Sequence, residues 1–360
     1  MDSVGAARDL ISAWRSEGRF TPSSDAWLRC FDPAFSKELA QRGLIGMTWP
    51  RSVGGAGRTH VDRLAVTEEL LRAGAPVAAH WIGDRQIGPA ILRHGSPELR
   101  DEILPAIISA DALFCLGMSE PEAGSDLADV RTKATETPEG WRISGRKIWT
   151  SHAHRATHCY VLARSEAGPK KHHGLSEFIV DMDSPGISIS PIHDLSGEHH
   201  FNEVTFDDVL VPAHRLLGVA GQGWRQVIEQ LSFERGGPER ILSTYPVLNE
   251  LIATVPSTPE AQSRVGALVA QLASLRQLAW RVARALDAGR APVQEAAALK
   301  FLGNAFEVEV IETYRALCGP GSGSRSSAFG QALLASPGFS LRGGSSDVLL
   351  SIIAKQEIAL

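Results

Sequence analysis

The sequence has few cysteines, and their spacing forms no recognisable pairs. It contains four among 360 residues: Cys30, Cys115, Cys159 and Cys318. Zinc sites and disulfide frameworks need cysteines at characteristic spacings, and the spacings here match neither. The sequence therefore predicts no zinc site and no disulfide-stabilised fold, and it fits a reducing compartment.

An excess of basic residues is also missing. The chain has 36 Lys and Arg against 41 Asp and Glu, which gives a formal net charge of −5. Proteins that bind nucleic acids or anionic membrane surfaces generally carry a basic excess. We therefore expect no nucleic-acid partner.

Long hydrophobic runs are absent as well. The opening MDSVGAARDLISAWRSEGRF mixes charged and apolar side chains and contains no apolar core of signal-peptide length. No later run approaches the roughly 18 apolar residues of a membrane-spanning helix. We expect a soluble, cytoplasmic protein without a membrane span.

The pattern of apolar residues changes along the chain. To about residue 112 it is helical, as in residues 60–74, whose apolar side chains lie mostly on one face. From about 113 to 215, short β-rich runs such as WRISG, HCYVLARS, SEFIVDM and NEVTFDDVLVP alternate with Gly, Pro and Asp turns. This alternation is typical of an antiparallel barrel or sandwich.

After Pro212 the helical period returns. Apolar residues recur at three- and four-residue steps through 260–289, and further helical segments cover 293–318, 345–360 and a stretch starting near Trp224. Four such segments are enough for an antiparallel bundle. We predict an α+β protein with an N-terminal helical domain (1–112), a middle β domain (113–215) and a C-terminal four-helix bundle (216–360).

Three segments resemble ligand sites only superficially. GVAGQG (218–223) and VGGAGRTH (53–60) have neither a dinucleotide fingerprint nor the lysine of a P-loop. SHAHRATHCY brings His152, His154 and His158 close to Cys159, but no acidic residue lies within the segment. We interpret these histidines as surface or loop residues and expect no bound metal.

The stretch SLRGGSSDVLL (340–350) raises a further possibility. A serine before an apolar run is a typical helix N-cap, and paired glycines let a ligand approach the backbone closely. From these residues alone, an ordinary helix entry and a ligand cradle are equal alternatives. The stretch contains no general base.

Five motifs together resemble the acyl-CoA dehydrogenase family of flavoproteins. In chain order they are FCLGMSEPEAGSDLADV (114–130), GRKIWTSHA (145–153), FDDVLVP (206–212), GQGW (221–224) and GGSSDVLLSIIAKQ (343–356). Each motif alone is weak, but the combination runs in the family's order over nearly the whole chain. The resemblance implies an FAD-dependent oxidoreductase with FAD between the β domain and the C-terminal bundle and an acyl thioester of coenzyme A as substrate.

The resemblance also implies which residues bind the cofactor and the substrate. In the family, donors meet the pyrimidine end of the flavin, an indole and neighbouring hydroxyls lie at its edge near N5, and a helix entry contacts FAD. The matching cofactor residues are Met118, Ser119, Trp149, Thr150, Ser151, Ser345, Ser346 and Asp347. The matching substrate residues are Ser125, Arg235 and Gly344. The alternative is that Trp149 is a strand core residue and that Ser119 and Ser125 are turn residues.

The catalytic base implied by the resemblance is Glu234. Many family members carry a glutamate just before the glycine of the C-terminal motif, where this chain has Gly343, which cannot accept a proton. Other members place the base ten positions after the aromatic or apolar residue of the Gly-x-Gly-x helix entry. Counted from Trp224, that position is Glu234, followed by Arg235. A solvated Glu–Arg pair on a helix is the alternative.

The implied reaction is α,β-dehydrogenation of an acyl-CoA to a trans-2-enoyl-CoA. Glu234 would abstract the α-proton, flavin N5 would take the β-hydride, and an electron-transfer flavoprotein would accept the electrons. One alternative is a non-catalytic or half-site subunit of a heteromeric acyl-CoA dehydrogenase. Another is a flavoenzyme of the same fold that acts on a carrier-protein thioester or uses oxygen. The sequence does not reveal the acyl group.

The chain departs from the family in one segment. Most members have an Arg-x-x-Phe-Gly sequence that reaches across a subunit interface to the ADP half of FAD, and none occurs between Glu239 and Val265. We interpret Glu239 and Arg240 as another solvated pair. The departure leaves two alternatives: a heterotetramer with a paralogous subunit, or a homo-oligomer in which Lys300 or Arg315 replaces the lost donors.

Overall fold

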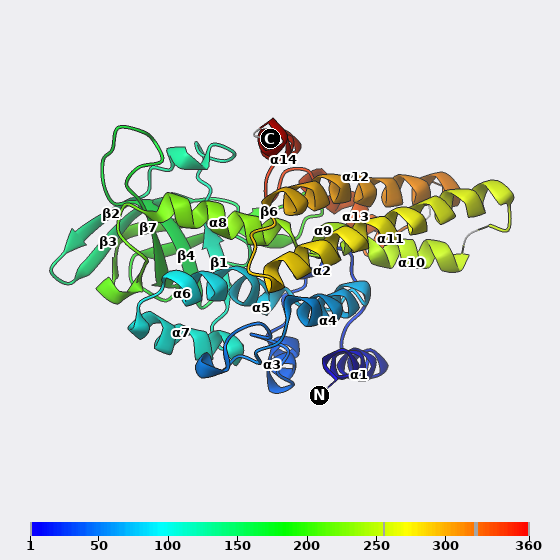
Figure 1. Ribbon diagram of the computed structural model, residues 1–360, viewed down its shortest axis with the longest axis horizontal. Coiled ribbons are helices and arrows are strands. Elements are labelled where there is room, and N and C mark those ends of the chain that lie inside the picture. The colour runs from blue at the N-terminus through cyan, green and yellow to red at the C-terminus, as the bar shows by residue number, and fades with distance from the viewer. Residues whose placement is uncertain (1, 255, 320–322, 359–360) are drawn as a thin grey trace. The chain divides into compact units, whose positions relative to one another are not determined.

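The computed structural model describes residues 2–254, 256–319 and 323–358. It divides into two compact units, each built from separate stretches of the chain (Figure 1). Unit 1 contains Met1–Asp32, Arg58–Ala78 and Leu231–Leu360, and unit 2 contains Pro33–Gly57 and Ala79–Gln230. We describe each unit separately.

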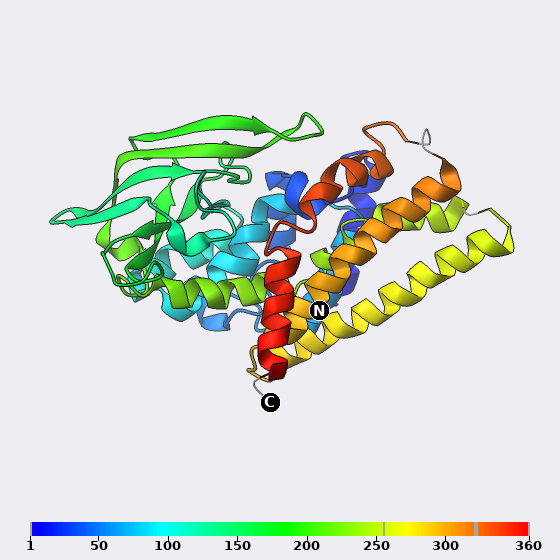
Figure 2. The same cartoon turned by 90° about the horizontal axis from the view of Figure 1, so that it is seen from above.

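Within the described residues, unit 2 contains one sheet of eight strands. The order is β6-β7-β3-β2-β4-β5-β8, and β1 pairs with β4. The strands are β1 (Phe114–Gly117), β2 (Lys133–Thr137), β3 (Gly140–Lys147), β4 (His158–Arg164), β5 (Leu175–Asp181), β6 (Ile187–His193), β7 (His199–Val211) and β8 (Leu216–Leu217). Most pairs are antiparallel, and β6 and β7 form a long ribbon (Figure 2), whereas β1 and β2 each pair with β4 in parallel.

The core of unit 2 is built largely from buried side chains of this sheet. Trp141 of β3 and Phe178 of β5 pack with their ring centroids 5.2 Å apart. The parallel pairing of β1 with β4 places Cys115 beside Cys159, and both side chains are fully buried. Burial raises the pKa of the Cys115 thiol well above its usual range. All four cysteines are free thiols.

The α-helices of unit 2 precede and follow the sheet in sequence. They are α3 (Pro33–Gln41), α5 (Ala78–Ile82), α6 (Gly88–His94), α7 (Pro97–Ile108) and the first part of α8 (Gly223–Arg235). The other short helical segments are η1 (Arg51–Val53), η2 (Gly83–Ile87), η3 (Leu127–Asp129) and η4 (Ala213–Arg215). Ser96 caps α7 by accepting a hydrogen bond from Leu99 N at 3.1 Å, and Pro97 occupies the first turn, where its missing N–H has no cost. The boundary between the units falls within α8.

Unit 1 is helical. Its helices are α1 (Ser3–Ser16), α2 (Ala26–Arg29), α4 (His60–Arg72), α9 (Glu239–Leu242), α10 (Tyr245–Thr254), α11 (Pro259–Asp287), α12 (Val293–Cys318), α13 (Ala328–Ala335) and α14 (Ser346–Ile358). The long α11 and α12 pack side by side, and α14 packs on α12 (Figures 1 and 2). Thr59 and Asp62 form a capping box at the start of α4. Gly303 lets α12 approach α9 closely, because a Cβ there would lie 2.1 Å from Arg240 O.

The predicted α+β class, with helices, then a β domain, then helices, is confirmed. The four predicted C-terminal helices correspond to α8, α11, α12 and α14, with α9, α10 and α13 as additional short helices. The predicted domain boundaries at 112 and 215 remain a prediction. Among the described residues, no helix combines the length and apolar character needed to cross a membrane.

Candidate functional site

A buried ion pair joins two of the motif segments in unit 2. Lys147 Nζ lies 2.8 Å from Glu120 Oε1 and donates a second hydrogen bond to Met118 O at 3.1 Å. The Lys147 side chain is fully buried and that of Glu120 is 5% exposed. Backbone N–H groups of Arg131 and Thr132 donate to the Glu120 carboxylate at 2.6 and 2.9 Å. The pair therefore fixes the segment around Met118 against the end of β3.

Lys147 and Glu120 are both charged at neutral pH. Burial lowers the pKa of Lys147 to about 8, against the opposing effect of Glu120. Burial acts to raise the pKa of Glu120, but the Lys147 charge and the hydrogen bonds hold it below its usual range. Both groups are consequently ionised near pH 7, and each compensates the buried charge of the other.

The segment after β3 presents an indole to the surface of unit 2. Ile148 N donates to Ser119 O at 2.9 Å, which ties this segment to the first motif a second time. Trp149 follows with φ of 60° and a 55% exposed side chain. Its ring meets Phe201 edge-on, with centroids 5.7 Å apart. The alternative that Trp149 is a core residue is therefore wrong, because the left-handed backbone turns the indole outward.

Thr150 combines full burial with an unsatisfied hydroxyl. Its N–H donates to Asn202 O at 3.0 Å, and Asn202 Nδ2 donates to Thr150 O at 2.9 Å. Thr150 Oγ1 has no hydrogen-bond partner in the part of the chain that the structure describes. A buried hydroxyl without a partner is costly, so it marks a position where a ligand would supply the missing bond. Ser151 follows in a turn, and Ser125 is exposed in a bend of the first motif.

In unit 1, the C-terminal motif forms a helix entry. Gly343 and Gly344 have φ of 68° and 111°, which favours glycine at both positions. Ser345 then caps α14, since its carbonyl accepts from Leu349 N at 3.0 Å and its hydroxyl from Val348 N at 3.5 Å. The N-cap expected from the sequence is confirmed. Ser346 begins α14, and Asp347 is exposed in its first turn.

The end of α8 contacts this glycine pair. Arg235, the last residue of α8, donates from Nε to Gly343 O at 3.1 Å. A Cβ on Gly344 would lie 3.4 Å from Arg235 Nε. The structure therefore brings together two predicted segments that are 108 residues apart in sequence. Glu234 precedes Arg235 in α8, and its side chain lies outside the described residues.

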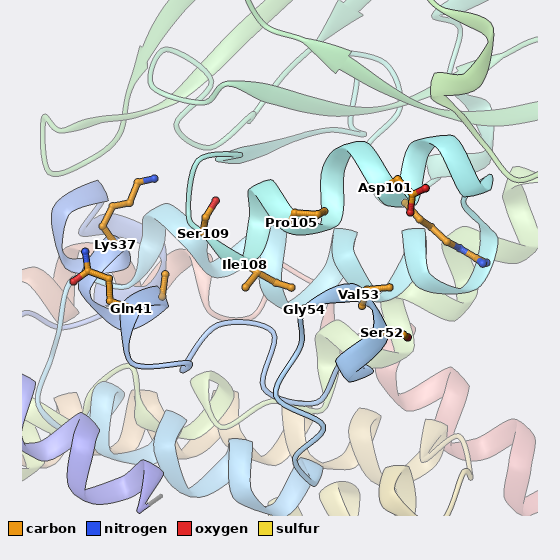
Figure 3. A pocket seen from close by; sticks show the side chains of 11 residues that line it. Lys37, Gln41, Ser52, Val53, Gly54, Asp101, Pro105, Ile108 and Ser109 are labelled. Atoms are coloured by element: carbon orange, nitrogen blue, oxygen red, sulfur yellow. The ribbon is translucent and has the colours of Figure 1, made fainter.

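A separate cavity lies elsewhere in unit 2. It has a volume of about 830 Å³ and is lined by α3, η1 and α7 (Figure 3). Its lining includes Lys37, Val53, Arg100 and Ile108 and none of the predicted site residues. No lining side chain is buried, and Lys37 forms an ion pair with Asp111. This cavity is therefore not part of the candidate site, which consists of the predicted cofactor and substrate residues.

Three domain models match the chain in order. The N-terminal domain of acyl-CoA dehydrogenase matches residues 15–111, the middle domain matches 115–209 and the C-terminal domain matches 221–358. The chain belongs to the acyl-CoA dehydrogenase family. Members of this family are FAD-dependent flavoproteins. The family predicted from the five motifs is therefore confirmed.

Individual relatives add detail to the family assignment. The chain is 42% identical over 213 residues to acyl-CoA dehydrogenase IpdE1 of Mycolicibacterium smegmatis, covering 56% of this chain and 54% of that protein. The chain thus spans about half the length of the curated relatives it matches first.

Solved structures match over nearly the whole chain. One is a variant of the Tcur3481-Tcur3483 steroid ACAD, with a TM-score of 0.87 and 25% identity, covering 99% of each chain. Another is the ChsE4-ChsE5 complex from Mycobacterium tuberculosis, with a TM-score of 0.83 and 26% identity, covering 99% of this chain and 97% of that chain.

The histidine segment supports the candidate flavin segment of this family member. His154 Nδ1 and His199 Nε2 lie 3.1 and 2.7 Å from Asn202 Oδ1, and Asn202 binds Thr150. His154 is exposed, and His152 lies in the same turn, which agrees with the interpretation as surface or loop residues, although His152 is only 5% exposed. His158 instead begins strand β4 and is partly buried. Among the described residues, no three His, Cys, Asp or Glu side chains are grouped as metal ligands.

The solvated pair expected at Glu239 and Arg240 is also wrong. Both side chains are 2% exposed, and their Oε1 and Nε atoms lie 3.8 Å apart. Burial follows from the close packing of α9 on α12 at Gly303. Lys300 is fully buried too and donates to Asn304 Oδ1 and to a backbone carbonyl, so it does not offer an exposed donor.

A buried carboxyl group that sequence reasoning missed lies beneath the first part of α8. Glu177 of β5 is fully buried, and its Oε2 accepts from Gln226 Nε2 at 2.8 Å and from Gln230 Nε2 at 3.4 Å. Burial raises the pKa of Glu177 to about 8. The group is therefore mainly protonated at pH 7. The one signal in the sequence that could have indicated a buried acceptor is the pair of glutamines four residues apart, which lie on the same face of a helix.

Glu177→Gln is expected to stabilise the protein at pH 8 but not at pH 4.5. The folded chain holds the Glu177 proton until about pH 8, while the unfolded chain releases it near 4.5, so stability is lost between these values. The amide removes that loss, and we expect the melting temperature to rise by at least about 2–4 °C at pH 8. Thermal unfolding at both pH values measures the difference.

The exposed Glu260 on α11 provides the control. Glu260→Gln should change the melting temperature equally, and little, at both pH values. A Glu177→Gln variant that is less stable at pH 8 than the parent would contradict the neutral carboxyl.

Proposed function

We propose that this protein is an FAD-dependent acyl-CoA dehydrogenase that introduces a trans double bond between Cα and Cβ of an acyl-CoA thioester. The hydrogen bond from Arg235 to Gly343 carries the proposal. It holds the neighbour of Glu234 against the position where many family members carry their base. Position 234 is thus one residue away in α8 from a side chain that reaches position 343, and this supports a base on α8 in place of a base at 343.

The residues of unit 2 fit a flavin. The Thr150 hydroxyl has no partner among the described residues and is available to a ligand atom, and the Lys147–Glu120 pair holds Met118 and Ser119 beside the segment that contains Trp149. In unit 1, the entry of α14 offers Ser345, Ser346 and Asp347. Bound FAD supplies the acceptor for the hydride that leaves Cβ.

The remaining chemistry belongs to side chains and backbone of the chain. Glu234 takes the α-proton as general base, and a thioester carbonyl that accepts hydrogen bonds makes this proton more acidic. Arg235 and Gly344 border the acyl thioester, and the exposed Ser125 contacts the CoA moiety. The proton on Glu234 and the hydride from Cβ account for both hydrogens that the substrate loses.

The acyl group we propose is bulky. Helix α8 ends at Arg235, and Gly236 and Gly237 form a turn directly after it, so no Cβ projects from two successive positions beside the base. One structural relative is a steroid ACAD. The test panel therefore contains branched and polycyclic acyl-CoAs as well as straight-chain ones.

The second candidate function is that of a same-fold enzyme that acts on carrier-protein thioesters. One structural neighbour is a prolyl acyl carrier protein oxidase.

Anaerobic titration of the purified flavoprotein tests the proposal. At least one acyl-CoA of the panel should bleach the oxidised flavin band and yield a 2-enoyl-CoA by mass spectrometry. Electron-transfer flavoprotein should then reoxidise the flavin. The proposal is wrong if a chemical reductant bleaches the bound flavin but no acyl-CoA does, and reduction only by carrier-protein thioesters would favour the second candidate.

We also propose a paralogous partner subunit. The chain lacks the Arg-x-x-Phe-Gly segment, Lys300 is buried, and Arg315 is paired with Glu312. Each lost charge-assisted hydrogen bond to a pyrophosphate weakens binding by about 1.5–3 kcal/mol, which is tenfold or more in affinity. The chain expressed alone should hold less than one FAD per polypeptide, and co-expression with a partner should raise this ratio. A full equivalent in a homo-oligomer after gel filtration would exclude the partner.

A further inference from the structure

Arg342 lies at the centre of a largely buried charge cluster in unit 1. Its Nη2 donates to Asp25 Oδ1 at 2.7 Å, and the two side chains are 19% and 2% exposed. The guanidinium carbon also lies 4.8 Å from the ring centroid of Trp27 and 4.9 Å from that of Phe339. An ion pair at one end and two aromatic contacts leave the Arg342 side chain little freedom.

Asp25 is itself held in place. Its backbone N–H donates to Ser243 O at 2.8 Å, and Trp27 Nε1 donates to Ser243 Oγ at 3.0 Å. The φ of Asp25 is 58°, a left-handed conformation that is uncommon for residues other than glycine and that aspartate adopts more readily than most. Ser243 N also donates to Glu307 Oε1 at 2.8 Å, which ties α12 to the same cluster. The cluster is therefore a rigid anchor.

The chain that follows Arg342 needs such an anchor. Gly343 and Gly344 both have positive φ and no side chain, so they contribute wide backbone freedom. Ser345 fixes the chain after them by capping α14. Arg342 fixes it before them, and between these two points the Gly343 carbonyl reaches Arg235.

We infer that Arg342 is a positioning residue for the end of α8 that carries Glu234. The Asp25 ion pair and the Trp27 contact hold Arg342, Arg342 holds the Gly343 peptide, and the Gly343 carbonyl holds Arg235. This inference rests on the proposed role of Glu234. Arg342 lies outside the family motifs, directly before the glycine pair. The inference adds it to the groups that set the geometry of proton transfer.

Three variants test the inference: Arg342→Met, Asp25→Asn and the double variant. Arg342→Met leaves the Asp25 carboxylate buried without its partner, so the melting temperature should fall. Asparagine tolerates the left-handed backbone, so adding Asp25→Asn removes the charge and should recover most of the thermal stability. Positioning should not recover in the double variant, because its methionine still cannot bind residue 25.

Two readouts report positioning. Hydrogen exchange at the backbone amides of residues 232–237 and 343–347 should remain faster in the double variant than in the parent. Flavin reduction at saturating acyl-CoA should remain about tenfold slower, since small displacements of reacting groups have effects of this size. The surface variant Arg264→Met, which removes an exposed ion pair with Glu260, should change neither readout.

The two possible failures are distinguishable. A double variant with parental exchange and parental reduction rate would overturn the inference, because Arg342 would then serve stability alone. If no acyl-CoA reduces the parental flavin, the proposed function fails, while the exchange measurement still decides whether Arg342 orders these two segments.

Discussion

Glu234→Gln is expected to slow the reduction of bound flavin by roughly 10² or more, the usual effect of losing a general base. The amide keeps the size of the side chain and cannot accept the α-proton. FAD content and acyl-CoA affinity should stay near parental values, because the variant changes only proton transfer. Single-turnover absorbance of the flavin, with the best acyl-CoA of the panel at saturation, measures the rate.

Glu229→Gln provides the matched control on the same helix. Glu229 lies five residues earlier on α8 and binds Arg93 Nε and His94 Nε2, each at 2.9 Å. Its loss removes a half-exposed ion pair and should leave the reduction rate within about twofold of the parent. Reduction of the Glu234→Gln flavin at the parental rate would show that another group takes the proton.

Lys147→Met is expected to cause the largest loss of stability, with a decrease of about 3–5 kcal/mol in the free energy of unfolding. It leaves the Glu120 carboxylate buried with two backbone N–H donors and no cation. The segment around Met118 also loses its bond to Lys147, so FAD affinity should fall as well. Denaturant unfolding and fluorescence titration with FAD measure the two effects.

The double variant Lys147→Met with Glu120→Gln distinguishes the cost of the unpaired buried charge from the loss of the bond that positions Met118. Removing the carboxylate should recover part of the stability, and FAD affinity should stay low because the Met118 carbonyl remains unbound. The surface pair of Lys171 and Asp126 supplies the control, since both side chains are more than half exposed. Lys171→Met should cost less than about 1 kcal/mol. Parental stability of Lys147→Met would contradict a structural role for the buried pair.

Much of the fold was predictable because its signals are local. The apolar period of α11 and α12 extends over seven or more turns, and α12 begins and ends where the sequence indicated, at Val293 and Cys318. Strands β1, β2 and β8 were missed. The β2 sequence KATET is polar, and β1 and β8 are only four and two residues long, so their pairing depends on β4 and β5 rather than on their own pattern.

Only the parts of the candidate site that lie within sequence motifs were predictable. The serine cap of α14 follows from local chemistry, and the contact between Arg235 and Gly343 was not visible because it joins residues 108 positions apart. Burial of Glu239, Arg240 and Glu177 was missed for a related reason. From sequence alone, a charged residue is expected to be exposed to solvent, because burial needs hydrogen-bonding partners. For these residues the partners come from distant helices and strands, which the sequence does not show.

The adjacent buried thiols of Cys115 and Cys159 allow local opening of the sheet to be measured by thiol labelling. Alkylating reagents attack thiolates, and both sulfurs are fully buried, so labelling at these positions requires the β1–β4 pair to separate. Cys30 and Cys318 are partly exposed and should react first. The difference in labelling rate between the two classes would therefore measure, on the unmodified chain, how often β1, the start of the first motif, separates from β4.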